Sequence, residues 1–117
     1  MRPLVTLRPV SDERLELAEE ALDRLVRRLR HLSPAAWRPR REPVERLLGE
    51  LVDMQRRLDP AVPADAALPA LADHGLAEAV DLLGAELLDA LAEAPPGPDS
   101  PLDRLLGELR AAWQTTR

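Results

Sequence analysis

Residues 43–51 read PVERLLGEL, and residues 101–109 read PLDRLLGEL. Seven of the nine positions are identical, and the two exceptions, Val44/Leu102 and Glu45/Asp103, keep the character of the side chain. The two copies are 58 residues apart in a chain of 117, so their spacing is about half the length of the chain. Within each copy the leucines are one, three and four residues apart, which places them on one face of a helix. The stretch therefore predicts two similar helices in an all-helical fold.

The repeat extends beyond these nine residues. At the same offset and without gaps, residues 20–51 match residues 78–109 at 13 positions. Composition alone would supply roughly half of these matches, because leucine, alanine and arginine are so common here. Two interpretations stay open. Either two related helical hairpins face each other across a pseudo-twofold axis, or leucine-rich helices merely resemble one another.

Four apolar stripes with helical period run along the chain, and they predict helices over residues 11–32, 43–58, 73–92 and 100–114. Ser11, Ser33 and Ser100 are expected as N-caps, and SPAAW (residues 33–37) as a single turn. Four stripes that must bury one another predict an all-α four-helix bundle. We expect one domain, residues 1–117, with loose ends at 1–10 and 115–117. The connection 59–72 is long enough for the second and third helices to run parallel.

Particular side chains are expected in the core of the bundle. The predicted core positions are Leu15, Ala18, Leu22, Leu25, Leu29, Leu32, Val44, Leu47, Leu48, Leu51, Gln55, Leu58, Leu76, Val80, Leu83, Leu87, Leu91, Leu102, Leu105, Leu106, Leu109 and Trp113. Gly49, Gly84 and Gly107 fall inside helices, where each costs up to about 1 kcal/mol against alanine. We interpret them as points of close helix approach, or as space for Trp37 or Trp113.

The composition favours a globular protein, with 45% hydrophobic and 32% charged residues. The chain has no cysteine, which excludes disulfides, a thiolate nucleophile and cysteine-ligated metal. Phe, Tyr, Ile, Lys and Asn are also absent, which indicates a GC-rich genome such as an actinobacterial one. No stretch resembles a signal peptide or a membrane span. We therefore expect a cytoplasmic protein with no membrane partner.

Charge is distributed unevenly between the halves. Residues 1–57 contain 13 arginines and 10 acidic residues, a net of +3, whereas residues 58–117 contain 3 arginines and 11 acidic residues, a net of −8. The halves are expected either to attract each other, within one chain or across a dimer, or to form ordinary solvated surface.

A cluster of arginines between residues 24 and 46 is the strongest local charge signal. As an anion-binding or nucleic-acid surface it would use Arg27, Arg28, Arg30, Arg38, Arg40 and Arg41. Trp37 would be available for stacking. The total charge of −5 and the single nearby aromatic residue argue against a nucleic-acid partner. The alternative is a solvated rim, or a patch that faces the acidic half.

Metal and carboxylate chemistry have little basis in this sequence. The two histidines, His31 and His74, lie near predicted helix ends and form no Glu-x-x-His pair. We therefore predict no metal site, no cofactor and no catalytic residue. Glu50, Glu86 and Glu108 lie at the edges of apolar stripes, where a carboxylate points either into a cleft or, more commonly, into solvent.

Residues 32–55, LSPAAWRPRREPVERLLGELVDMQ, resemble the first part of DinB-like bundle proteins, including the N-terminal domains of mycothiol-dependent maleylpyruvate isomerases. The residues that match that family's turn and following helix are Leu32, Ser33, Pro34, Trp37, Val44, Leu47, Leu48, Leu51, Val52 and Asp53. GLAEAVDLLGAELLDAL (residues 75–91) also resembles the third helix of short members. The resemblance implies a four-helix bundle with a long connection between the second and third helices.

The same resemblance argues against the family's metal-dependent transferase activity. Family enzymes hold a divalent metal with three histidines, and Glu50 stands at the first of these positions. The fourth predicted helix contains no histidine. The resemblance thus implies the scaffold without its metal site.

Three hypotheses about function follow. The first is a non-catalytic, DinB-like bundle that acts through protein–protein contact, as a homodimer or with a protein partner. The second is a small-molecule-binding or thiol-transfer bundle with a pocket near Trp37, Glu50 and Trp113. The third is an anion or nucleic-acid binder that uses the arginine cluster.

Overall fold

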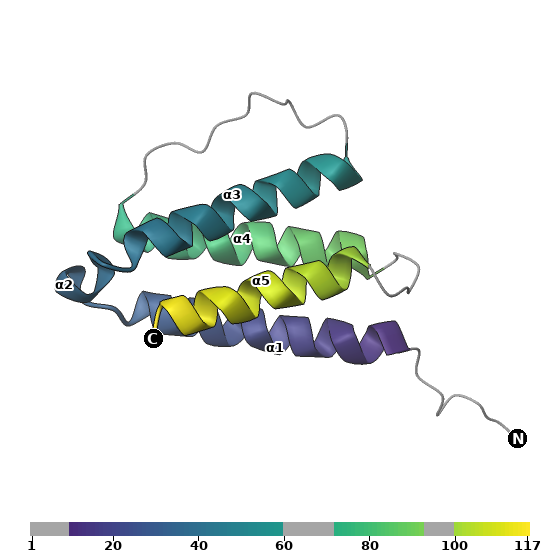
Figure 1. Ribbon diagram of the computed structural model, residues 1–117, viewed down its shortest axis with the longest axis horizontal. Coiled ribbons are helices and arrows are strands. Elements are labelled where there is room, and N and C mark those ends of the chain that lie inside the picture. The colour runs from purple at the N-terminus through teal and green to yellow at the C-terminus, as the bar shows by residue number, and fades with distance from the viewer. Residues whose placement is uncertain (1–9, 60–71, 93–99) are drawn as a thin grey trace, which may run out of the picture.

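The computed structural model describes residues 10–59, 72–92 and 100–117, with side chains from residue 13 onward, and every long element in these ranges is an α-helix (Figure 1). The helices are α1 (Val10–Arg30), α2 (Pro34–Trp37), α3 (Arg41–Leu58), α4 (Asp73–Leu91) and α5 (Pro101–Thr115). The described residues contain no strand. The prediction of an all-α four-helix bundle is confirmed, with the short α2 as the expected turn.

Two serines begin helices as predicted. The Oγ of Ser33 accepts a hydrogen bond from the backbone N–H of Ala36 (3.2 Å), and the Oγ of Ser100 accepts one from Asp103 (3.2 Å). Each satisfies an N–H group that has no partner within its helix, and the proline after each serine suits the first helical position.

The boundaries of two helices, α1 and α3, differ from the prediction. The N–H groups of His31 and Leu32 donate to carbonyls three residues back (3.1 and 3.3 Å), which tightens the last turn and ends α1 at Arg30. At the start, α1 includes Ser11, which is therefore not its N-cap. α3 begins at Arg41, two residues before Pro43, because a proline is tolerated in the first turn, where its missing N–H has no helical partner.

The four long helices form a closed square in which the neighbours of α1 are α4 and α5, and the neighbours of α3 are also α4 and α5. α1 and α3 occupy opposite corners, and so do α4 and α5, which touch only slightly. α3 and α4 run parallel, which the long connection between them allows, and so do α1 and α5 (Figure 1). Each of these pairs is antiparallel to the other.

This arrangement bears on the internal repeat. Exchanging α1 with α4, and α3 with α5, leaves both the neighbours and the relative directions unchanged, as a twofold axis across the bundle requires. The two helices of each half lie on a diagonal, so the halves are not hairpins with packed arms. Each helix instead packs mainly against helices of the other half.

The core matches the predicted stripes closely. Leu47/Leu105, Leu48/Leu106 and Leu51/Leu109 are all buried, so the repeated leucines hold equivalent places. Met54 and Ala112 are buried where Gln55 and Trp113 were predicted. Leu58 was also predicted in the core, but it lies at the end of α3 and is exposed. Leu15, Leu32 and Leu83 are partly buried at the margin of the core.

Of Gly49, Gly84 and Gly107, only Gly84 marks a close helix approach. A Cβ added at Gly84 would lie 2.6 Å from Cδ1 of Leu22 on α1. A Cβ added at Gly49 or Gly107 would meet nothing within 4 Å. The interpretation of these last two as close contacts is wrong, and the neighbour of Gly84 is a leucine rather than a tryptophan.

The C-terminal residues are held rather than loose. Thr116 is 1% exposed, and its Oγ1 donates to the carbonyl of Ala112 (2.8 Å). Arg40 donates from Nε to the carbonyl of Thr116 (2.7 Å) and from Nη2 to the main-chain oxygen of Arg117 (3.0 Å). These donors satisfy carbonyls at the end of α5, so the expected loose end at 115–117 is not observed. At the other end, Val10 belongs to α1, and residues 1–9 lie outside the described ranges.

Candidate functional site

A groove lies on the surface between α1 and α5. Its volume is about 340 Å³. The lining residues are Leu17, Glu20, Ala21 and Arg24 of α1, and Leu109, Arg110, Trp113 and Gln114 of α5. Leu109 is buried and Ala21 is partly buried, so the floor is apolar, while Leu17 at the rim is 45% exposed. We call this feature the α1/α5 groove.

Trp113 is held in the groove by arginines of α1. The guanidinium carbon of Arg28 lies 3.4 Å from the centroid of the indole ring, and that of Arg24 lies 5.7 Å away. Nη1 of Arg28 also donates to the carbonyl of Trp113 (3.4 Å). The positive guanidinium is attracted to the negative face of the ring. Trp113 is thus half-buried under cationic side chains, at the border of the core in which it was predicted.

Two arginines of the groove have no carboxylate partner. Arg24 and Arg110 form no ion pair with any described residue, and Arg28 contacts the tryptophan. The arginines that do form ion pairs are Arg14, Arg27, Arg30, Arg41, Arg46, Arg56 and Arg104. The groove therefore offers two guanidinium groups that form no ion pair with the residues that the structure describes.

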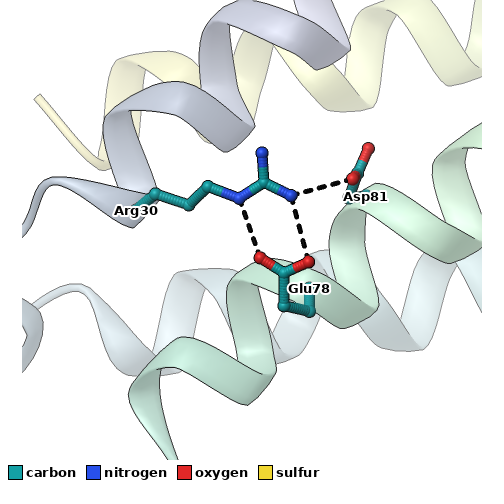
Figure 2. Close-up of polar contacts among 3 residues, drawn as sticks. All are labelled: Arg30, Glu78 and Asp81. Carbon is teal, nitrogen blue, oxygen red and sulfur yellow. Dashed lines mark hydrogen bonds and ion pairs between the residues drawn. The ribbon is translucent and has the colours of Figure 1, made fainter.

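Arg30 bridges α1 to the acidic helix α4 (Figure 2). Its Nε and Nη2 donate to the two carboxylate oxygens of Glu78 (2.8 and 3.0 Å), and Nη2 also donates to Asp81 (3.0 Å). The paired hydrogen bonds from Arg30 lower the pKa of Glu78. The same bonds raise the pKa of Arg30, so both groups stay ionised over a wider pH range.

Most other predicted anion-binding arginines are also engaged within the chain. Arg27 pairs with Asp23 of its own helix, and Arg41 bonds Asp73 of α4 (2.8 Å). Arg40 binds main-chain oxygens near the end of α5. Arg38 is exposed and has no polar contact with a described residue. Arg30 and Arg41 thus face acidic residues of the second half within one chain, which is one of the alternatives that the sequence left open.

The three residues of the predicted ligand pocket are separated in the structure. Trp37 is 3% exposed and lines a cavity of about 360 Å³ beside the start of α4, with Asp73 and His74. Trp113 lines the α1/α5 groove instead. Glu50 lines neither, and it lies 3.8 Å from Arg104 of α5. These positions do not assemble a single site.

The groove went unrecognised in the sequence because its two walls are far apart in the chain. Leu17 falls outside the apolar stripe of its helix, and its exposed apolar side chain was the available signal.

Among residues 10–59, 72–92 and 100–117, no three His, Cys, Asp or Glu side chains lie close enough to hold a metal ion together. No helix in the same ranges is long and apolar enough to cross a membrane. Comparison of the chain with family models, curated proteins and solved structures gives no match.

Proposed function

We propose that this chain is a non-catalytic helical bundle that acts through protein–protein contact. The observation that carries the proposal is the α1/α5 groove, where an exposed leucine and a half-buried tryptophan lie in one open depression. Tryptophan and arginine are the residues most enriched among those that dominate binding energy at protein interfaces. An open groove of this kind leaves a small molecule largely exposed, whereas a protein surface can cover it.

The alternative functions have less support. A small-molecule or thiol-transfer site near Trp37, Glu50 and Trp113 would need three side chains that line no common cavity described above. An anion or nucleic-acid surface would need arginines that already bind Glu78, Asp81 and Asp73. A ligand would have to break these contacts before it could bind there.

We also propose a DinB-like scaffold for the bundle. The proposal rests on the turn at residues 32–37 and on the parallel helices α3 and α4, which are joined by a long connection. At the first metal-ligand position of that family, Glu50 faces the guanidinium of Arg104. The positive charge of the arginine disfavours binding of a metal cation to this carboxylate, which supports a scaffold without metal chemistry.

Native mass spectrometry of the purified chain tests this proposal, because it reports assembly and bound small ligands in the same spectrum. We expect a chain without a stoichiometric metal ion or small molecule, either as a homodimer or as a monomer whose partner is a different protein. A monomer that carries about one metal ion or one organic ligand per chain would contradict the proposal. A bare monomer would exclude the homodimer and leave contact with a different protein.

A further inference from the structure

The α1/α5 groove has the length of a helix-recognition surface. On α1 it extends from Leu17 to Arg24, seven residues or about 10 Å along the axis. Leu17 marks one end, and Trp113, beside Arg24 and Arg28, marks the other. Apolar side chains at positions i and i+7 of a partner helix are separated by the same distance. Both apolar ends of the groove would therefore contact such a helix at once.

The positive charge of the groove favours a partner with negative charge. Arg24 and Arg110 lack carboxylate partners among the described residues, and Glu20 is the one carboxylate in the lining. A guanidinium binds a carboxylate through parallel, charge-assisted hydrogen bonds. Acidic residues beside the apolar stripe of a partner would be bound by these two arginines, whereas basic residues would be repelled.

A second copy of this chain also carries an acidic helix with an exposed leucine, and it fits less well. Leu82 of α4 is 62% exposed. Three carboxylates near it are already used, since Glu78 and Asp81 bind Arg30 and Glu86 accepts a hydrogen bond from Gln55 (2.9 Å). A helix from another protein brings carboxylates that are free to pair.

We infer that the α1/α5 groove binds an acidic amphipathic helix of another protein, with apolar residues on Leu17 and Trp113 and carboxylates on Arg24 and Arg110. The inference deepens the proposed function and rests on it. It names one surface of the bundle and the chemistry of the partner that fits it.

Two designed peptides test the inference. Both are helices of about 15 residues with leucines at i, i+3 and i+7, and they differ only in flanking glutamates or flanking lysines. Titration of the intact protein, followed by anisotropy of the labelled peptide, should show at least about tenfold tighter binding of the acidic peptide at low salt. Added salt should reduce this preference.

Matched variants locate the binding surface. Arg24→Gln with Arg110→Gln should remove the preference for the acidic peptide. Arg38→Gln with Arg57→Gln, which changes two exposed arginines outside the groove, should preserve it. Leu17→Glu should weaken binding of the acidic peptide at least about tenfold, whereas Leu82→Glu should not. Circular dichroism checks that each variant keeps the helical fold.

Three results would overturn the inference. Equal affinity for the two peptides would show that the charge of the partner does not matter. An unchanged preference for the acidic peptide in the Arg24/Arg110 double variant would show that the peptide does not bind at these arginines. A homodimer that both Leu17→Glu and Leu82→Glu dissociate would identify a second copy as the occupant. That last result, or a protein complex formed elsewhere, would still support the proposed function, whereas a monomer loaded with metal would contradict it.

Discussion

Gly84 lies where α4 packs closely against Leu22 of α1. The contact with Leu22 leaves no room for a Cβ, while Gly49 and Gly107 face open space. We predict that Gly49→Ala and Gly107→Ala each raise the free energy of unfolding by up to about 1 kcal/mol, because alanine is the better helix former. We expect Gly84→Ala to lower it, because buried Leu22 must move.

Denaturant unfolding of the three variants measures these effects. Gly84→Ala should lower the free energy of unfolding by less in a chain that also carries Leu22→Ala, because the clashing methyl groups of Leu22 are then absent. If Gly84→Ala raised the free energy of unfolding as much as Gly49→Ala does, Leu22 would have to move aside without cost.

Glu78 is predicted to make the stability of the bundle depend on acid pH. Its pKa is lowered in the folded state, first by the hydrogen bonds from Arg30, so the folded chain binds fewer protons than the unfolded chain in this range. The stabilisation is therefore present above the ordinary pKa of 4.5 and is lost as the pH falls through the lowered value. Glu78→Gln should be less stable than the original chain at neutral pH and equally stable in strong acid.

Glu20 provides the matched control, because it occupies the equivalent position of the repeat and has no ion pair with a described residue. Glu20→Gln should shift the thermal midpoint little at either pH. A Glu78→Gln variant with the same stability as the original chain at all pH values would show that the bridge to Arg30 contributes nothing in solution.

At the scale of the element, α3 and α5 share the nine-residue repeat and occupy equivalent corners of the bundle. We predict that Leu48→Ala and Leu106→Ala destabilise the fold by similar amounts, each about 2–5 kcal/mol, because both side chains are buried among core residues. Leu51→Ala and Leu109→Ala should form a second such pair. Glu50→Ala and Glu108→Ala should cost far less, since both carboxylates are only partly buried.

Equilibrium unfolding in urea measures each pair. Pair members that differ by more than about 2 kcal/mol would indicate that equivalent positions in the sequence lie in environments that relax differently around a cavity. A costly Glu50→Ala would instead direct attention back to a pocket beside that residue.

Local signals account for the part of the architecture that the sequence predicts well. Ser33 and Ser100 cap their helices by accepting a hydrogen bond from the backbone N–H three residues later. The spacing of the leucines within each helix indicates which of its side chains are buried. The position of Trp113 was less predictable, because the cation that holds it, Arg28, is 85 residues away in the chain. The α1/α5 groove was unpredictable for the same reason, since Leu17 and Trp113 come to line one groove only after α1 and α5 have packed together.

At the scale of the whole molecule, the charge contrast between the halves is used to join them. Arg14–Asp103, Arg30–Glu78 and Arg41–Asp73 each connect a basic residue of the first half to an acidic residue of the second. These pairs are partly exposed, so each contributes modestly to stability. Their combined effect favours pairing of unlike halves over pairing of like halves.

The diagonal placement of the helices means that neither half has a core of its own. We predict that residues 1–59 and 72–117, produced as separate polypeptides, each lack stable helical structure alone, because α1 hardly touches α3 and α4 hardly touches α5. Mixed together, the fragments should restore the helical circular dichroism signal, with a melting temperature that rises with their concentration. Fragments that fold independently would contradict this expectation. A chain that needs both halves in order to fold is one that can be cut at residues 60–71 into a split reporter, whose signal depends on the two pieces meeting.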